Sequence, residues 1–175
     1  MTHFGDRLTE ANRRTATPLC MGIDPHISMI PAIFGDAQDG AASDAAIRAI
    51  DDFSMACLEQ AIGNVAAIKP QAAFFEQQGP AGMQILQNLG RAAIDAGLLV
   101  IMDAKRGDIG STSTAYAAGW IGHDAPFPSD ALTVNPWLGI DTLAPFLDRA
   151  DATGSGLFIL NRTSNPGAGD LQDQM

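Results

Sequence analysis

Five short apolar runs, each followed by a segment of helical periodicity, constrain the fold of this chain more than any other feature. Apolar runs of this length that alternate with helices are typical of parallel strands buried on both faces. We expect strands at residues 18–23, 65–68, 98–102, 131–134 and 157–160. We expect helices at residues 4–14, 45–62, 79–96, 112–121 and 140–150. The sequence therefore predicts an α/β fold built from repeated strand–helix units.

Polar side chains gather at the carboxyl ends of these expected strands. They are Asp24, Lys69, Asp103 with Lys105, Asn135 and Asn161. The first strand lacks the glycine-rich turn of a dinucleotide-binding fold, which disfavours a Rossmann-type sheet. Functional groups at the carboxyl ends of parallel strands are typical of (β/α)8 TIM barrels. We therefore favour such a barrel over an open sheet.

The length of 175 residues fits one domain, residues 1–175, that holds about the first five β/α units. A complete barrel of this class takes about 250 residues, so we expect an incomplete one. The amphipathic segment 4–14, with Phe4, Leu8 and Ala11 on one side, is expected to cover the bottom of the barrel. A loosely packed terminal helix is the alternative.

Composition excludes several functional classes. The formal net charge of -10 and the pI of about 4.4 leave no basic surface for nucleic acid or an anionic membrane. No run approaches the roughly 18 apolar residues of a membrane span, and the charged first 14 residues do not form a signal peptide. We therefore expect a cytoplasmic protein. Cys20 and Cys57 are too few for a disulfide framework or a metal site, and we expect both to be buried for packing.

The stretch 100–109 carries the clearest chemical signal. Its apolar strand ends in Asp103, Lys105 and Asp108, and residues two apart on a strand project to the same side. With Lys69 they would form one network of opposed charges, in which each charge stabilises its neighbours. Lys69, Lys105 and Arg106 are the expected sources of local positive charge for an anionic substrate. A structural salt-bridge cluster at the barrel mouth is the alternative, although buried ion pairs stabilise poorly.

The chain resembles the orotidine 5'-phosphate decarboxylase family, most closely its longer bacterial branch. The resemblance is carried by Asp-x-Lys-x-x-Asp-Ile at residues 103–109 and by four flanking stretches in order: Leu19–His26, Ile68–Gln71, Thr133–Gly139 and Thr163–Gly167. It implies a TIM barrel that converts orotidine 5'-monophosphate to uridine 5'-monophosphate without a metal or an organic cofactor.

The resemblance also implies catalytic roles. Lys105 would deliver a proton to pyrimidine C6 as the substrate carboxylate leaves as carbon dioxide, and Asp103 would face that carboxylate. Repulsion between the two carboxylates and electrostatic stabilisation of the transition state by Lys105 are both candidate sources of the rate. Lys69 would join the network and reach the ribose.

Binding roles follow from the same resemblance. Asp24 would accept a hydrogen bond from the ribose, and Ser164 would bind the amide edge of the pyrimidine, although each also suits an ordinary turn. Asn135 would line the pocket. Asp108, Ile109 and Thr112 would enter the site of a neighbouring subunit in a homodimer with shared active sites. A helix cap is the alternative for Asp108.

Two other functions stay open. The family's phosphate-binding loop and arginine belong to a later part of the barrel, and neither Arg106 nor Arg162 aligns with that arginine, so an inactive barrel fragment is one alternative. A magnesium-dependent sugar-phosphate decarboxylase or synthase with the same motif is the other, although Lys69–Gln71 and Ser164–Gly167 speak against it. A Schiff-base aldolase is disfavoured because neighbouring acids keep Lys105 charged.

Overall fold

The computed structural model describes residues 2–38 and 42–174 and has the expected parallel α/β fold. The five strands are β1 (Cys20–Ile23), β2 (Ala67–Pro70), β3 (Leu99–Arg106), β4 (Ala131–Val134) and β5 (Gly156–Ile159). The α-helices are α1 (Phe4–Thr15), α2 (Asp44–Ala61), α3 (Ala72–Glu76), α4 (Gly79–Asp95), α5 (Gly110–Trp120) and α6 (Ala144–Thr153). Short 3-10 helices occupy Ile27–Met29, Ala32–Phe34, Ile140–Leu143 and Pro166–Asp170.

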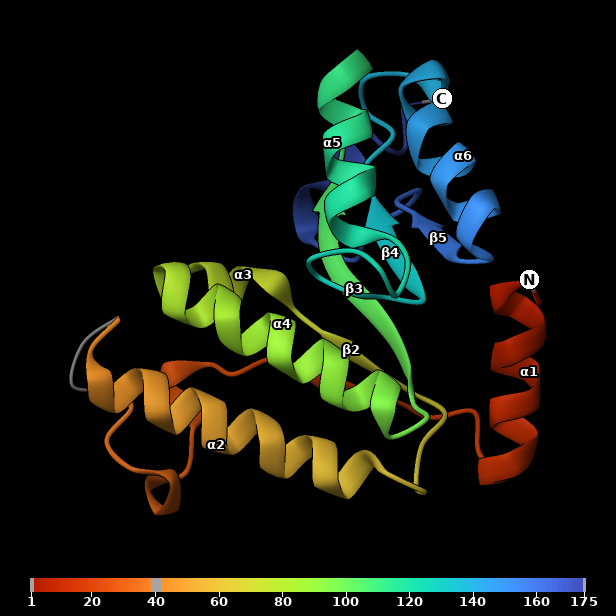
Figure 1. Cartoon of the computed structure of the whole chain (residues 1–175). Coiled ribbons are helices and arrows are strands. Elements are labelled where there is room, and N and C mark those ends of the chain that lie inside the picture. Colours follow the sequence, from red (N-terminus) through yellow and green to blue (C-terminus); the bar gives the residue numbers. More distant parts are fainter. Residues whose placement is uncertain (1, 39–41, 175) are drawn as a thin grey trace.

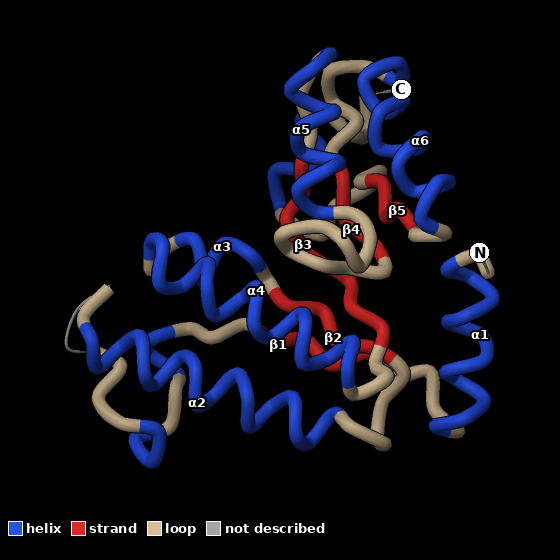
Figure 2. Tube along the Cα trace, in the orientation of Figure 1, coloured by secondary structure: helices blue, strands red, loops and turns tan. Residues whose placement is uncertain are grey.

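The order of the strands confirms five successive units of a barrel rather than an open doubly wound sheet. All pairs are parallel, and the order in space is β1-β2-β3-β4-β5, the same as along the chain. A doubly wound sheet would reverse this order at a switch point. Figure 1 shows α2 and α4 beside the first strands and α5 and α6 beside the later ones, while α1 lies apart from them. Figure 2 shows the strands in the middle of the molecule, with the helices around them.

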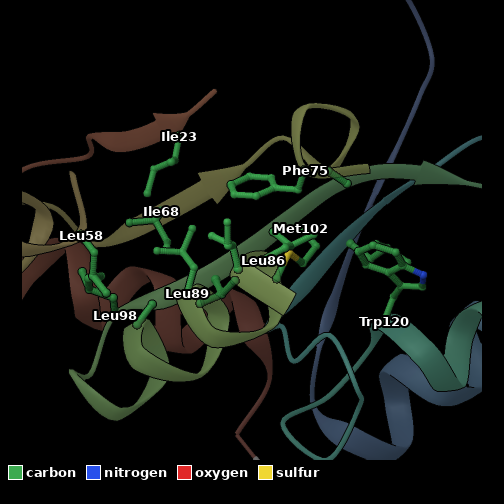
Figure 3. Close-up of a cluster of buried hydrophobic side chains, with 14 of the residues drawn as sticks. Ile23, Leu58, Ile68, Phe75, Leu86, Leu89, Leu98, Met102 and Trp120 are labelled. Atoms are coloured by element: carbon green, nitrogen blue, oxygen red, sulfur yellow. The ribbon is translucent and has the colours of Figure 1, made fainter. Parts of the chain in front are cut away.

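The larger core lies between the sheet and the helices that follow its strands. Ile23, Ile68 and Met102 of the sheet pack against Leu86 and Leu89 of α4, and all five side chains are buried (Figure 3). Phe75 of α3 and Trp120 of α5 extend the same layer. The middle of the sheet is the best covered part, since all four residues of β4 and the first five of β3 are buried.

Helix α1 covers the opposite face at the amino-terminal ends of the strands, as the amphipathic pattern predicted. Phe4 and Ala11 form a second buried cluster with residues of β2, β3 and β4, and the rings of Phe4 and Phe158 meet edge to face at 6.0 Å. Arg7 of this helix forms an ion pair with the buried carboxylate of Asp130. This packing leaves the carboxyl ends of the strands as the place for a site.

Helix boundaries follow the local signals in the sequence. Ser43 caps α2, since its hydroxyl accepts a hydrogen bond from the Ala46 backbone N–H at 3.1 Å. Pro80 lies in the first turn of α4, where its missing N–H has no cost. The structure adds the five-residue helix α3 immediately after β2, which the sequence did not predict.

Two further expectations were wrong. Strand β3 continues to Arg106 instead of ending at residue 102, so Asp103 and Lys105 are part of the strand. Cys20 is exposed rather than buried, because it borders an open cavity between β1 and α1, and Cys57 is half-buried.

Candidate active site

A bulge in β3 builds the centre of the site. Met102 pairs with Leu132 and Arg106 pairs with Val134, so four steps along β3 match only two steps along β4. Lys105 lies in this bulge and has a left-handed backbone with φ of +47°. Bulges change the direction of side chains and are common beside active sites. The two-residue alternation that predicted a common side for Asp103 and Lys105 therefore does not apply here, although their side chains do meet.

The carboxylate of Asp103 is the shared partner of both lysines. Lys69 and Lys105 are the only two lysines in the sequence. The Lys69 Nζ lies 2.8 Å from Asp103 Oδ2, and the Lys105 Nζ forms an ion pair with Oδ1. Asp103 itself is 7% exposed. Two positive charges from different strands thus converge on one buried negative charge at the carboxyl end of the sheet.

Two neutral side chains complete the surroundings of this carboxylate. The Thr133 hydroxyl donates to Asp103 Oδ1 at 3.0 Å, and the Gln71 amide donates to Oδ2 at 3.2 Å. Each oxygen therefore accepts two hydrogen bonds, which is about the full capacity of an ionised carboxylate. The sequence pattern predicted no role for either residue. The available signal was position along the chain. Gln71 directly follows β2 and pairs with Asp103 across the sheet, and Thr133 lies within β4.

The environment holds Asp103 in its ionised form. Burial favours the neutral acid, but hydrogen bonds from Lys105 and Lys69, the charge of Lys69 and the Thr133 hydroxyl outweigh it. The pKa of Asp103 is therefore lowered from its usual 3.8. Three of the four residues predicted for the network, Lys69, Asp103 and Lys105, are therefore in direct contact through this carboxylate.

Asp108, the fourth predicted member, lies outside this contact. It is half-buried on the loop after β3, and its carboxylate accepts a hydrogen bond from the Ile109 backbone N–H at 2.7 Å. The side chain does not cap α5, whose N-cap position is Ile109. Ile109 and Thr112 are both exposed beside it. The whole segment from Asp108 to Thr112 therefore faces outward from the described chain.

The other predicted binding residues lie on loops that follow the strands. Asp24 is exposed directly after β1, and Ser164 is exposed in the loop after β5. Asn135 is exposed after β4, and its side-chain oxygen accepts a hydrogen bond from the Trp137 backbone N–H at 3.0 Å. All three are at the carboxyl end of the sheet, while only Lys69, Asp103 and Lys105 are in direct contact.

Arg106 does not supply free positive charge, contrary to expectation. Its guanidinium forms an ion pair with Glu76 and lies 4.6 Å from the centre of the Trp120 ring. As the last residue of β3 it points toward the helices, where Glu76 neutralises it. Arg162 forms an ion pair with Asp173 at 2.7 Å. The local positive charge of the site therefore comes from the two lysines.

A cavity of about 370 Å³ lies between α1 and the inner face of the sheet. Leu8 and Asn12 of α1 line one side, and Lys69, Ile101 and Thr133 line the other. Across residues 2–38 and 42–174, no group of three or more His, Cys, Asp or Glu side chains is placed to bind a metal ion. Within the same residues, no helix combines the length and apolar character of a membrane span.

Comparison with known proteins places these features in one family. The sequence model of the "Orotidine 5'-phosphate decarboxylase / HUMPS family" matches residues 17–175. Orotidine 5'-phosphate decarboxylases from Rhodopirellula baltica and Streptomyces coelicolor are 44% and 46% identical over 99% and 98% of this chain. The chain spans 59% of the length of each of these relatives.

Solved structures agree with this result. A Streptomyces avermitilis crystal structure, assigned as an orotidine 5'-phosphate decarboxylase, superposes with a TM-score of 0.87 at 44% identity. The superposed region covers 99% of this chain and 57% of the Streptomyces avermitilis chain. The Leishmania donovani OMP decarboxylase superposes with a TM-score of 0.73 at 35% identity, over 58% of its length and 98% of this chain.

Proposed function

Because this chain belongs to the orotidine 5'-phosphate decarboxylase / HUMPS family, we propose that the intact protein converts orotidine 5'-monophosphate to uridine 5'-monophosphate in pyrimidine biosynthesis. The relatives that share 43–46% identity carry the name of this activity. The observation that carries the proposal is the convergence of both lysines on the buried carboxylate of Asp103. Residues 1–175 would form a single domain, the amino-terminal part of the barrel, in a cytoplasmic enzyme.

The proposed reaction needs a cation that stabilises negative charge and then gives up a proton. The bond between C6 and the carboxylate breaks, carbon dioxide leaves, and the electron pair stays on C6. The Lys105 ammonium stabilises this charge and transfers its proton to C6, and solvent then returns a proton to the lysine. Asp103 has two functions: it orients Lys105, and it places negative charge beside the departing carboxylate. Lys69 balances Asp103 and reaches toward the ribose.

Three exposed residues at the carboxyl ends of the strands are proposed to bind the rest of the substrate. Asp24 would accept a hydrogen bond from a ribose hydroxyl, Ser164 would pair with the amide edge of the pyrimidine, and Asn135 would line the pocket. Their exposure on loops leaves them accessible to a ligand at the same end of the sheet as Lys105.

A homodimer with shared sites is also proposed. The segment Asp108–Thr112 projects outward, and Asp108 is separate from the three charges that already contact one another. Ile109, 61% exposed, is an apolar side chain that a partner would bury. A second copy would then receive Asp108 beside its own Lys105, together with Ile109 and Thr112.

A magnesium-dependent sugar-phosphate enzyme is less well supported by the site. Magnesium binding requires carboxylate oxygens with free lone pairs, whereas both oxygens of Asp103 already accept two hydrogen bonds each. The decisive assay follows the absorbance of orotidine 5'-monophosphate with the intact protein, with and without EDTA. We expect turnover that EDTA does not change. Failure to convert this nucleotide, or a loss of activity that magnesium restores, would contradict the proposal.

A further inference from the structure

The hydroxyl of Thr133 contacts two candidate catalytic residues at once. It accepts a hydrogen bond from the Lys105 backbone N–H at 2.9 Å and donates its own proton to Asp103 Oδ1 at 3.0 Å. Both roles are compatible, because a hydroxyl has one proton to give and two lone pairs to accept with. Thr133 is 8% exposed, so neither hydrogen bond is readily replaced by water.

The backbone of Lys105 needs such a partner. Its φ of +47° lies in the left-handed region, which a side chain with a Cβ rarely adopts. The bulge between Met102 and Arg106 interrupts the regular pairing of β3 with β4 at this point. The Thr133 side chain therefore supplies the acceptor for the Lys105 N–H at a position where the ladder is irregular.

We propose that Thr133 is a positioning residue, which fixes the left-handed bulge at Lys105 and the orientation of the Asp103 carboxylate through one hydroxyl. It acts through Lys105 and Asp103, the two residues that its hydroxyl contacts. This inference deepens the proposed decarboxylation and rests on it for its effect on rate. The geometry it describes is independent of the reaction.

Gln71 has a different position around the same carboxylate. Its amide donates to Oδ2, the oxygen that Lys69 also contacts, at 3.2 Å. Thr133 is on the side of Oδ1, the oxygen that Lys105 contacts. Loss of the Thr133 hydroxyl should therefore disturb the Lys105 half of the network more than the Lys69 half.

The test compares Thr133→Val, Thr133→Ala and Thr133→Ser in the intact protein. Valine keeps the β-branch but removes the hydroxyl, whereas serine keeps the hydroxyl. If serine preserves the parent properties and valine and alanine do not, the effect is due to the hydrogen bonds. Thr153→Val is the matched control, because the Thr153 hydroxyl donates to the Arg149 carbonyl at 2.9 Å at the end of α6, just before the amino terminus of β5.

Two readouts distinguish positioning from a general loss of stability. The first is the pKa of Asp103, measured by carboxyl 13C NMR in protein labelled at aspartate. We expect Thr133→Val and Thr133→Ala to raise this pKa, since a hydrogen bond to the charged form is lost. Thr133→Ser and Thr153→Val should leave it unchanged. If Thr133→Val does not fold, the comparison of alanine with serine gives the same answer.

The second readout is the split between kcat and KM. We expect Thr133→Val to lower kcat by at least about tenfold, as the loss of a hydrogen bond to a charged group implies, with little change in KM. Serine should restore most of kcat. An unchanged Asp103 pKa together with an unchanged kcat in Thr133→Val would overturn the inference. A raised pKa in a protein that does not convert the nucleotide would support the inference and refute the proposed function.

Discussion

Lys105 reaches the Asp103 carboxylate from a left-handed backbone inside a bulge of β3. A regular strand would place these two side chains on the same face without any left-handed backbone. This backbone strain is tolerated because two hydrogen bonds fix Lys105. Its backbone N–H donates to the Thr133 hydroxyl, and its ammonium donates to the Asp103 carboxylate. The charged centre of the site is therefore a feature of backbone geometry as much as of residue type.

Replacing Asp103 by asparagine should destabilise the protein in a pH-dependent way. The two lysines would lose their shared counter-charge, and we expect a loss of about 1.5–3 kcal/mol in the free energy of unfolding at pH 7. The pKa of Asp103 is lowered on folding, so its stabilising effect is complete above its ordinary value of 3.8 and disappears as the pH falls through the lower folded value.

Urea unfolding of parent and Asp103→Asn at several pH values measures this effect. The difference between them should be constant above about pH 5 and should shrink below pH 4. Asp95→Asn, at an exposed site on α4, should change the unfolding free energy by less than about 0.5 kcal/mol. If the difference in unfolding free energy between parent and Asp103→Asn grows as the pH falls, the neighbours of Asp103 do not lower its pKa.

The loops after β3 and β4 should separate when Gly107 is replaced by alanine. A Cβ at Gly107 would lie 2.5 Å from the carbonyl oxygen of Asn135, and because this oxygen belongs to the backbone, no side-chain rotation can relieve the clash. We expect a cost of about 1–3 kcal/mol in unfolding free energy, and a fall in activity because the rim of the site moves.

Gly119→Ala is the matched control for this change. A Cβ at Gly119 of α5 meets no atom within 4 Å, and alanine is favoured over glycine in a helix. Thermal unfolding should therefore show a lower Tm for Gly107→Ala and an equal or higher Tm for Gly119→Ala. Equal Tm values for parent and Gly107→Ala would show that the two loops are not in close contact.

Subunit mixing tests whether Asp108 acts in a neighbouring site. Lys105→Ala and Asp108→Ala should each be inactive alone, because each breaks every site of its own dimer. Unfolding and refolding them together should restore activity, since hybrid dimers would hold one intact site, giving about a quarter of all sites for random pairing.

Mixing Lys105→Ala with Asp103→Asn is the control, because both residues belong to the same half of each site and no intact site results. Recovery in the first mixture alone would establish shared sites. Absence of recovery in both mixtures, with dimers present by sedimentation, would place Asp108 in the site of its own subunit.

The barrel units and two of the three contacting charges were predictable from the sequence. Lys69 and Asp103 follow apolar runs, and the carboxyl ends of parallel strands meet at one edge. The meeting of Lys105 with Asp103 was predicted correctly for the wrong reason, because a bulge changes the pairing of β3 without leaving a glycine or proline in the sequence. Bulges of this kind are set by the neighbouring strand, which a single strand does not reveal.

The remaining differences also arise from tertiary context. Thr133 was overlooked because threonine is an ordinary strand residue, and only the register of β4 places its hydroxyl at the bulge. Arg106 was expected to supply positive charge to the site, but it forms an ion pair with Glu76 of helix α3, which the sequence did not predict. Cys20 was expected to be buried, but it borders the open cavity beside α1.

The most direct test of the account is the rate of orotidine 5'-monophosphate decarboxylation by the intact protein and its Lys105→Ala variant. Loss of a positioned general acid typically lowers a rate by about 10²–10⁴-fold, and we expect a fall in this range. Arg13→Ala, which removes an exposed cation from α1, should keep the parent rate. If Lys105→Ala, folded to the same extent as the parent, decarboxylates the nucleotide at the parent rate, Lys105 is not the proton donor and the central claim is wrong.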